Sequence, residues 1–62
     1  MQKIEFKLSE NKELIKAIID ELPFLSRFDV QKILKNKDAK VNGVRCSENI
    51  KVEKNGNITV FY

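Results

Sequence analysis

Basic side chains are concentrated in the middle of the chain, between residues 26 and 45. This segment contains six cations and two acids, a net charge of +4 (6 − 2), whereas the rest contains six cations and seven acids, a net charge of −1 (6 − 7). Because nucleic-acid affinity rests largely on contacts to phosphates, such a block is typical of a phosphate-binding surface, although an ordinary solvated face has the same composition. The six cations are Arg27, Lys32, Lys35, Lys37, Lys40 and Arg45.

The positions of four of these cations indicate how a phosphate-bearing partner would be bound. Arg27 is expected in the first turn of a helix, where free backbone N–H groups already favour an anion and a guanidinium can add a two-pronged phosphate contact. The alternative for Arg27 is pairing with Asp29 or with the preceding helix. Lys35, Lys37 and Lys40 lead from the end of this helix into the next strand, a path that can follow successive phosphates of an RNA backbone.

Three uncharged residues are further candidates for RNA contacts. Phe28 lies among the cations of the predicted helix, where its ring can either stack on an unpaired RNA base or pack against the preceding loop that contains Phe24. Gln31 lies on the flank of the same helix. Asn42 is expected to serve a turn first, because asparagine tolerates positive φ, with a side-chain contact to RNA as a secondary role.

Residues suited to catalysis or metal binding are scarce. The chain has no histidine and one cysteine, Cys46, so it can form neither an internal disulfide nor a Cys/His metal cluster. General acid–base chemistry needs a carboxylate with a shifted pKa in a pocket, whereas Asp20 and Glu21 are expected at an exposed helix end. No nucleophile–base pair or phosphate-binding glycine loop is present. We therefore expect no catalytic residue, metal or cofactor within these residues.

The length and composition predict one small, folded domain. The chain has 62 residues, of which 42% are hydrophobic and 34% charged, enough apolar material for a thin core. No apolar run approaches the roughly 20 residues that span a bilayer, and the N-terminus alternates where a signal peptide is continuously apolar. Together with the lone cysteine, these features favour a cytoplasmic, monomeric domain that does not bind membranes.

Two elements are predicted in the first 22 residues. Ile4, Phe6 and Leu8 alternate with charged residues, which predicts a half-buried strand. Apolar residues then recur at three- and four-residue spacing, which predicts a helix over about 10–22 that ends before Pro23. These apolar residues are Leu14, Ile15, Ile18, Ile19 and Leu22.

A second helix is predicted over about 26–36. Ser26 can cap its start with Asp29 in a capping-box position, and Leu25 and Val30 would form the hydrophobic staple. At about 100° per residue, one face is apolar and its flank is polar and cationic. The apolar face consists of Val30, Ile33 and Leu34, and the flank of Arg27, Gln31 and Lys35.

Short strands follow from Ala39 onward. Asn42-Gly43 between 39–41 and 44–46 predicts a hairpin with a type I′ turn, which requires positive φ at both central residues. This turn places Val41 opposite Val44 and Lys40 opposite Arg45, and two like charges facing each other suggest a shared anion or simple solvent screening. Further strands are predicted at 50–52 and, after a turn at 54–57, at 58–62. The fold class is therefore α+β: two packed helices, then a small, mostly antiparallel sheet in which the N-terminal and C-terminal strands can pair.

Residues 22–60, LPFLSRFDVQKILKNKDAKVNGVRCSENIKVEKNGNITV, resemble the small RNA-binding domain named after ribosomal protein S-four, also called the alpha-L motif. The similarity lies in the order of its pieces: Leu22-Pro23, Ser26-Arg27 opening a helix, the helix body VQKIL, the hairpin KVNG, and a late Asn-Gly before the final strand. Lys37 stands where the family usually has glycine. Residues 1–22 look like the leader that precedes this domain at the N-terminus of bacterial pseudouridine synthases of the large-subunit ribosomal RNA type.

The resemblance implies a partner and a function. In that family the second helix and the following hairpin form an L-shaped basic surface that sits on folded RNA. We therefore expect docking of structured ribosomal RNA through Arg27, Phe28, Gln31, Lys32, Lys35, Lys37, Lys40, Asn42 and Arg45. The resemblance further implies an accessory module within a longer chain, a pseudouridine synthase (an isomerase) whose catalytic aspartate lies in a separate domain.

Two alternatives remain at the level of the sequence. The first is a free-standing domain of the same type that acts on ribosomes or transfer RNA. The second, from a different class, is a small protein-binding module of the ubiquitin-like kind, against which the two consecutive predicted helices argue.

Overall fold

The computed structural model describes all 62 residues and confirms the α+β class. Two consecutive helices separate short N-terminal strands from the strands that follow. In chain order the elements are β1 (Lys3–Lys7), β2 (Lys12–Glu13), α1 (Leu14–Glu21), α2 (Arg27–Lys35), β3 (Ala39–Val41), β4 (Val44–Cys46), β5 (Lys51–Val52) and β6 (Asn57–Phe61).

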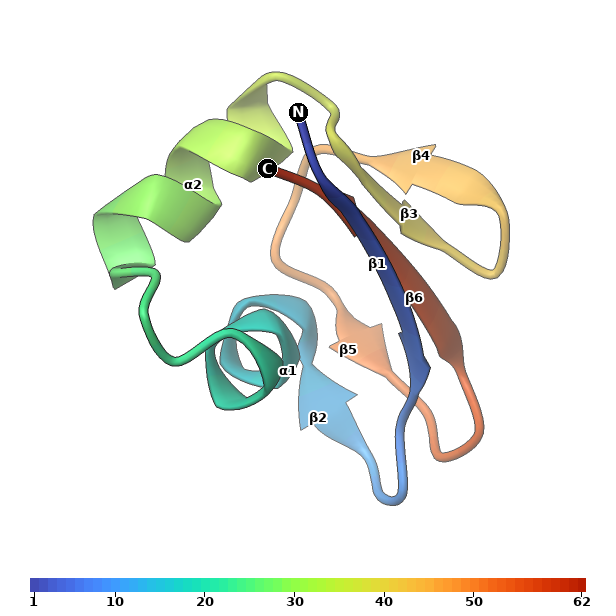
Figure 1. Cartoon of the computed structure of the whole chain (residues 1–62). Coiled ribbons are helices and arrows are strands. Elements are labelled where there is room, and N and C mark those ends of the chain that lie inside the picture. Colours follow the sequence, from blue (N-terminus) through green and yellow to red (C-terminus); the bar gives the residue numbers. More distant parts are fainter.

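The main sheet has four antiparallel strands in the order β1-β6-β3-β4. The predicted pairing of the N-terminal and C-terminal strands is confirmed, with Ile4 opposite Val60 and Phe6 opposite Ile58. The pairing continues past the strand ends, where the Tyr62 N–H donates to the Gln2 carbonyl at 2.9 Å. The two chain ends therefore lie side by side, near α2 (Figure 1).

Both helices cover the same face of this sheet (Figure 1). Ile58 and Val60 point into that layer from the central strand and are completely buried. The apolar positions that predicted the helices supply most of the rest of the core, because their spacing places them on one side of each helix. The core consists of Leu8, Leu14, Ile15, Ala17, Ile18, Leu22, Val30, Leu34, Ala39, Val52, Ile58 and Val60.

The first helix begins at Leu14, so the predicted start near residue 10 is wrong. Lys12 and Glu13 are extended and pair with β5 in a separate two-stranded sheet, to which the predicted 50–52 strand contributes only Lys51–Val52. The reason lies far along the chain: the Leu14 N–H donates to the Ile50 carbonyl at 2.8 Å, and the Ile15 N–H to Asn49 Oδ1 at 3.0 Å. The segment 49–50 thus caps a helix for which the sequence supplies no local cap.

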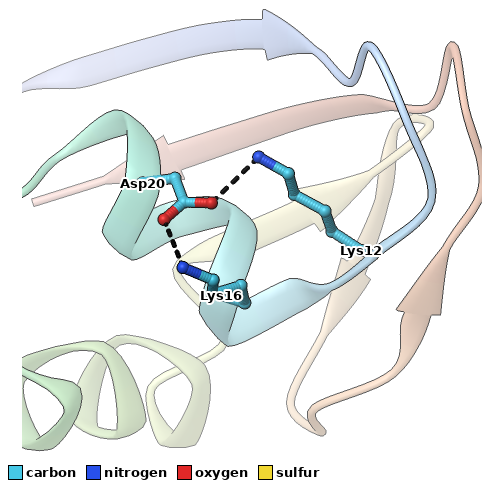
Figure 2. A network of polar contacts seen from close by, with 3 residues as sticks. All are labelled: Lys12, Lys16 and Asp20. Atoms are coloured by element: carbon cyan, nitrogen blue, oxygen red, sulfur yellow. Dashed lines mark hydrogen bonds and ion pairs between the residues drawn. The ribbon is translucent and has the colours of Figure 1, made fainter.

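Asp20 links β2 to α1 by binding one lysine from each element (Figure 2). Its two carboxylate oxygens accept from Lys16 Nζ at 2.8 Å and from Lys12 Nζ at 2.9 Å. The hydrogen bond from Lys16, followed by that from Lys12, lowers the pKa of Asp20, and the hydrogen bond to Asp20 raises the pKa of Lys12. Asp20 therefore forms ion pairs with two lysines, one on β2 and one on α1.

Because Asn49 caps α1 from a distant part of the sequence, substituting it should lower the stability of the protein. Asn49→Ala should lower the free energy of unfolding by about 1 kcal/mol, because the partly buried Ile15 N–H loses its acceptor. Chemical denaturation followed by circular dichroism measures this difference. Glu48→Ala is the matched control and should change stability by less than about 0.5 kcal/mol, since only its backbone carbonyl is engaged. Equal effects of the two substitutions would contradict the capping role.

Candidate nucleic-acid interface

The start of α2 is held by the predicted capping box. Ser26 Oγ accepts from the Asp29 N–H at 3.1 Å, and the Ser26 N–H donates to Asp29 Oδ2 at 3.0 Å. The hydrogen bonds from the Ser26 backbone and then from its side chain lower the pKa of Asp29. A carboxylate thus already sits at the positively polarised end of the helix, so a phosphate bound near Arg27 would share this end with an acid.

The two sides of α2 differ sharply in burial. Val30 and Leu34 are buried and Ile33 is half-buried, which confirms the predicted apolar face. The opposite side carries residues at positions i, i+3, i+4, i+7 and i+8, which form one stripe on a helix. These residues line a shallow, open hollow and are Phe28, Gln31, Lys32, Lys35 and Asn36.

Phe28 lies in this stripe with its ring turned to solvent. It is 66% exposed, and Lys32 Nζ lies 5.6 Å from the centre of its ring. Phe24, the packing partner considered from the sequence, instead lies with its ring centre 5.8 Å from that of Tyr62 at the other end of the chain. The interpretation that Phe28 packs against the preceding loop is therefore wrong.

The end of α2 turns sharply at Lys37, which has a φ of 58°. The Asp38 N–H donates to the Ile33 carbonyl and the Lys37 N–H to the Leu34 carbonyl, both at 2.9 Å, a pattern typical of a Schellman motif. Glycine is the usual residue at this left-handed position. The turn thus takes the left-handed form that glycine favours, although a lysine occupies it.

Arg45 ties the hairpin to this turn. Its Nη1 donates to the Lys37 carbonyl at 2.7 Å, which links β4 to the turn after α2. Nothing in the sequence indicated this bond, because a side chain on a return strand carries no local signal for a carbonyl eight residues earlier. Arg45 therefore positions the hairpin as well as adding charge.

The hairpin has the predicted geometry. Asn42 and Gly43 have φ values of 51° and 83°, as a type I′ turn requires, and Lys40 lies opposite Arg45 in register. Since Ala39 faces the core, alternation turns Lys40 and Arg45 toward the outer side of the sheet. There Lys40 Nζ lies 5.7 Å from the ring centre of Phe61.

Asn42 has a further structural role that the sequence did not reveal. Its side-chain Oδ1 accepts from the Asn57 N–H at 2.9 Å, and its own N–H donates to the Asn57 carbonyl at 2.7 Å. These two bonds hold the hairpin turn against the first residue of β6. The side-chain oxygen of Asn42 is thus committed within the fold, although Asn42 was predicted to contact RNA as a secondary role.

None of the six cations between residues 26 and 45 forms an ion pair. The three ion pairs of the molecule join Lys3 to Glu5 and both Lys12 and Lys16 to Asp20. Arg27 in particular pairs neither with Asp29 nor with α1. The predicted cations come from α2, from the turn after it at Lys37, and from the hairpin. We call this set the α2–hairpin surface: Arg27, Lys32, Lys35, Lys37, Lys40 and Arg45.

The other side chains offer no comparable constellation. No three cysteine or acidic side chains come together in a way that could hold a metal ion. Neither helix has the length and apolar character that crossing a bilayer would require.

A scan against protein-family models and a search of curated proteins both return no match to this chain.

The capping box predicts an acid-sensitive contribution to stability. The folded-state pKa of Asp29 lies below its ordinary value of 3.8, so the carboxylate stabilises the fold above about pH 4 and loses this effect as the pH falls through the lowered pKa. The melting temperature of Asp29→Ala should therefore lie below that of the unsubstituted protein at pH 7, with the gap closing in acid. Thermal unfolding of both proteins across this range measures the gap.

Asp20 titrates in both proteins, so its contribution cancels from the difference. A gap that stays constant from pH 7 into strong acid would show that Asp29 acts through packing or helix propensity rather than through its charge.

Proposed function

We propose that this protein is an RNA-binding domain that docks structured RNA, ribosomal RNA foremost, through the α2–hairpin surface. The observation that carries the proposal is the absence of ion pairs at all six cations of this surface, while all three ion pairs use lysines elsewhere. Cations without an acidic partner are available to phosphates, and their binding releases the counterions condensed on the RNA, which supplies affinity. The resemblance of residues 22–60 to the S-four type supports the same partner.

The placement of the cations also supports a backbone contact. Lys35 lies in the last turn of α2, Lys37 forms the turn itself, and Arg45 reaches the Lys37 carbonyl. These side chains come from three successive segments whose backbone is ordered by the helix, the turn and the hairpin. An ordered backbone favours recognition of a folded RNA by its shape and phosphates.

The resemblance of the first 22 residues to the leader of pseudouridine synthases extends the proposal to an accessory role. In that role the domain contributes no catalytic residue and raises the local concentration of RNA at a catalytic domain. A free-standing domain of the same type would use the same surface. Against the ubiquitin-like alternative stand the two consecutive helices, α1 and α2.

The first test measures the salt dependence of binding. Lys35→Ala should weaken binding to a structured ribosomal RNA hairpin and reduce the slope of log affinity against log salt by about one, because one phosphate contact is lost. Fluorescence anisotropy over a range of KCl concentrations measures both quantities. Lys54→Ala is the matched control, since Lys54 is also exposed and without an ion pair but lies in the turn before β6.

Two results would contradict the proposal. One is no binding of the unsubstituted protein at low salt. The other is an equal loss in Lys35→Ala and Lys54→Ala, which would indicate attraction by net charge without a defined surface.

The second test separates stability from affinity at one residue. Lys37→Gly should raise the free energy of unfolding by up to about 1 kcal/mol, because glycine adopts a φ of 58° without the clash of a Cβ atom. The same substitution should weaken RNA binding, since it removes a cation from the surface. Asn55→Gly, at another left-handed position with a φ of 72°, is the control and should leave RNA affinity unchanged. If the Lys37→Gly protein binds RNA with unchanged affinity, Lys37 does not contribute to the RNA-binding surface.

A further inference from the structure

Phe28 is the large apolar residue that α2 exposes to solvent. Phe28 is 66% exposed and lies on the side of the helix opposite the buried Val30 and Leu34. Removal from water is the usual benefit of an aromatic side chain, and this ring obtains little of it within the protein. A ligand that covers the ring would supply that benefit.

The surroundings of Phe28 define the chemistry of such a ligand. Lys32 lies 5.6 Å from the ring centre and Lys35 lies one turn further along the hollow. The amide side chains of Gln31 and Asn36 line the same hollow and can each donate and accept hydrogen bonds. A flat ring between cations and amides matches a planar heterocycle that carries a phosphate, which is the chemistry of a nucleotide.

We propose that this hollow receives a single unpaired base of the RNA, stacked on Phe28, with Lys32 and Lys35 on the flanking phosphates. This inference rests on the proposed function and specifies its target: an RNA with a bulged or looped-out nucleotide. A base within a continuous duplex has both faces covered by its neighbours, so it offers no face to the ring.

The amides add a means of selection. Gln31 and Asn36 lie three and eight residues after Phe28, on the same stripe of α2. A base stacked on the Phe28 ring lies parallel to it, and its hydrogen-bonding edge points outward from the stack, where amides can donate to it and accept from it. Phosphates bound by lysines alone would not need these amides.

The test uses two RNA hairpins of equal length, one with a single bulged nucleotide and one fully paired. The 62-residue chain should bind the bulged hairpin about ten-fold more tightly, as expected for one base stacked on an aromatic ring. In Phe28→Ala and Phe28→Leu this ratio should fall to near one, and in Phe28→Trp it should persist. Anisotropy titrations at fixed salt measure the ratio.

Phe24→Ala is the matched control, because Phe24 is 68% exposed but lies by Tyr62 away from the hollow. It should keep the ten-fold ratio. A bulged 2-aminopurine provides an independent readout: its fluorescence should be quenched on binding to the unsubstituted protein and much less on binding to Phe28→Leu. Circular dichroism checks that each variant is folded.

The outcomes separate this inference from the proposed function. Equal binding of the two hairpins by the unsubstituted protein, or an equal loss of the ratio in Phe24→Ala and Phe28→Ala, would overturn the stacking site and leave RNA docking intact. Failure to bind either hairpin at low salt would overturn both.

Discussion

The arrangement of this molecule depends on the burial of one strand, β6. Ile58 and Val60 are completely removed from water, and β6 pairs with β1 on one side and β3 on the other. A chain of 62 residues has apolar material for one core only, so both helices are needed over this one face. The outer side of α2 and the outer face of the hairpin are consequently left to solvent, and cations without an ion pair lie in both places.

Two acids of the chain are engaged by partners outside the α2–hairpin surface. Asp20 pairs with two lysines on the side of α1, and Asp29 closes the capping box. Neither acid forms an ion pair with a cation of the surface. The basic side chains of the surface therefore remain available to an anion.

Features encoded by neighbouring residues could be predicted from the sequence. The capping box at Ser26, the Asn42-Gly43 turn and the alternation in β1 each involve residues a few positions apart, and each is present. Features that join distant segments could not be predicted. Asn49 caps α1 from 34 residues away, and the Asn42 side chain accepts a hydrogen bond from Asn57. The ring of Phe24 lies next to that of Tyr62 and not next to that of Phe28. In the candidate site, the cations were predictable from charge alone, whereas the bond from Arg45 to Lys37 required the fold.

The pairing of β1 with β6 also determines the order in which the molecule can assemble. Residues that lie fifty or more positions apart must meet to pair β1 with β6. Closing the sheet therefore costs chain entropy before its contacts form, which favours slow folding for so short a chain. During synthesis α2 and the hairpin would leave the ribosome before β6, without the strand that organises them. The basic segment would then spend that interval as a loosely structured polycation beside ribosomal RNA, and would acquire its defined shape only once residues 57–61 are free to pair.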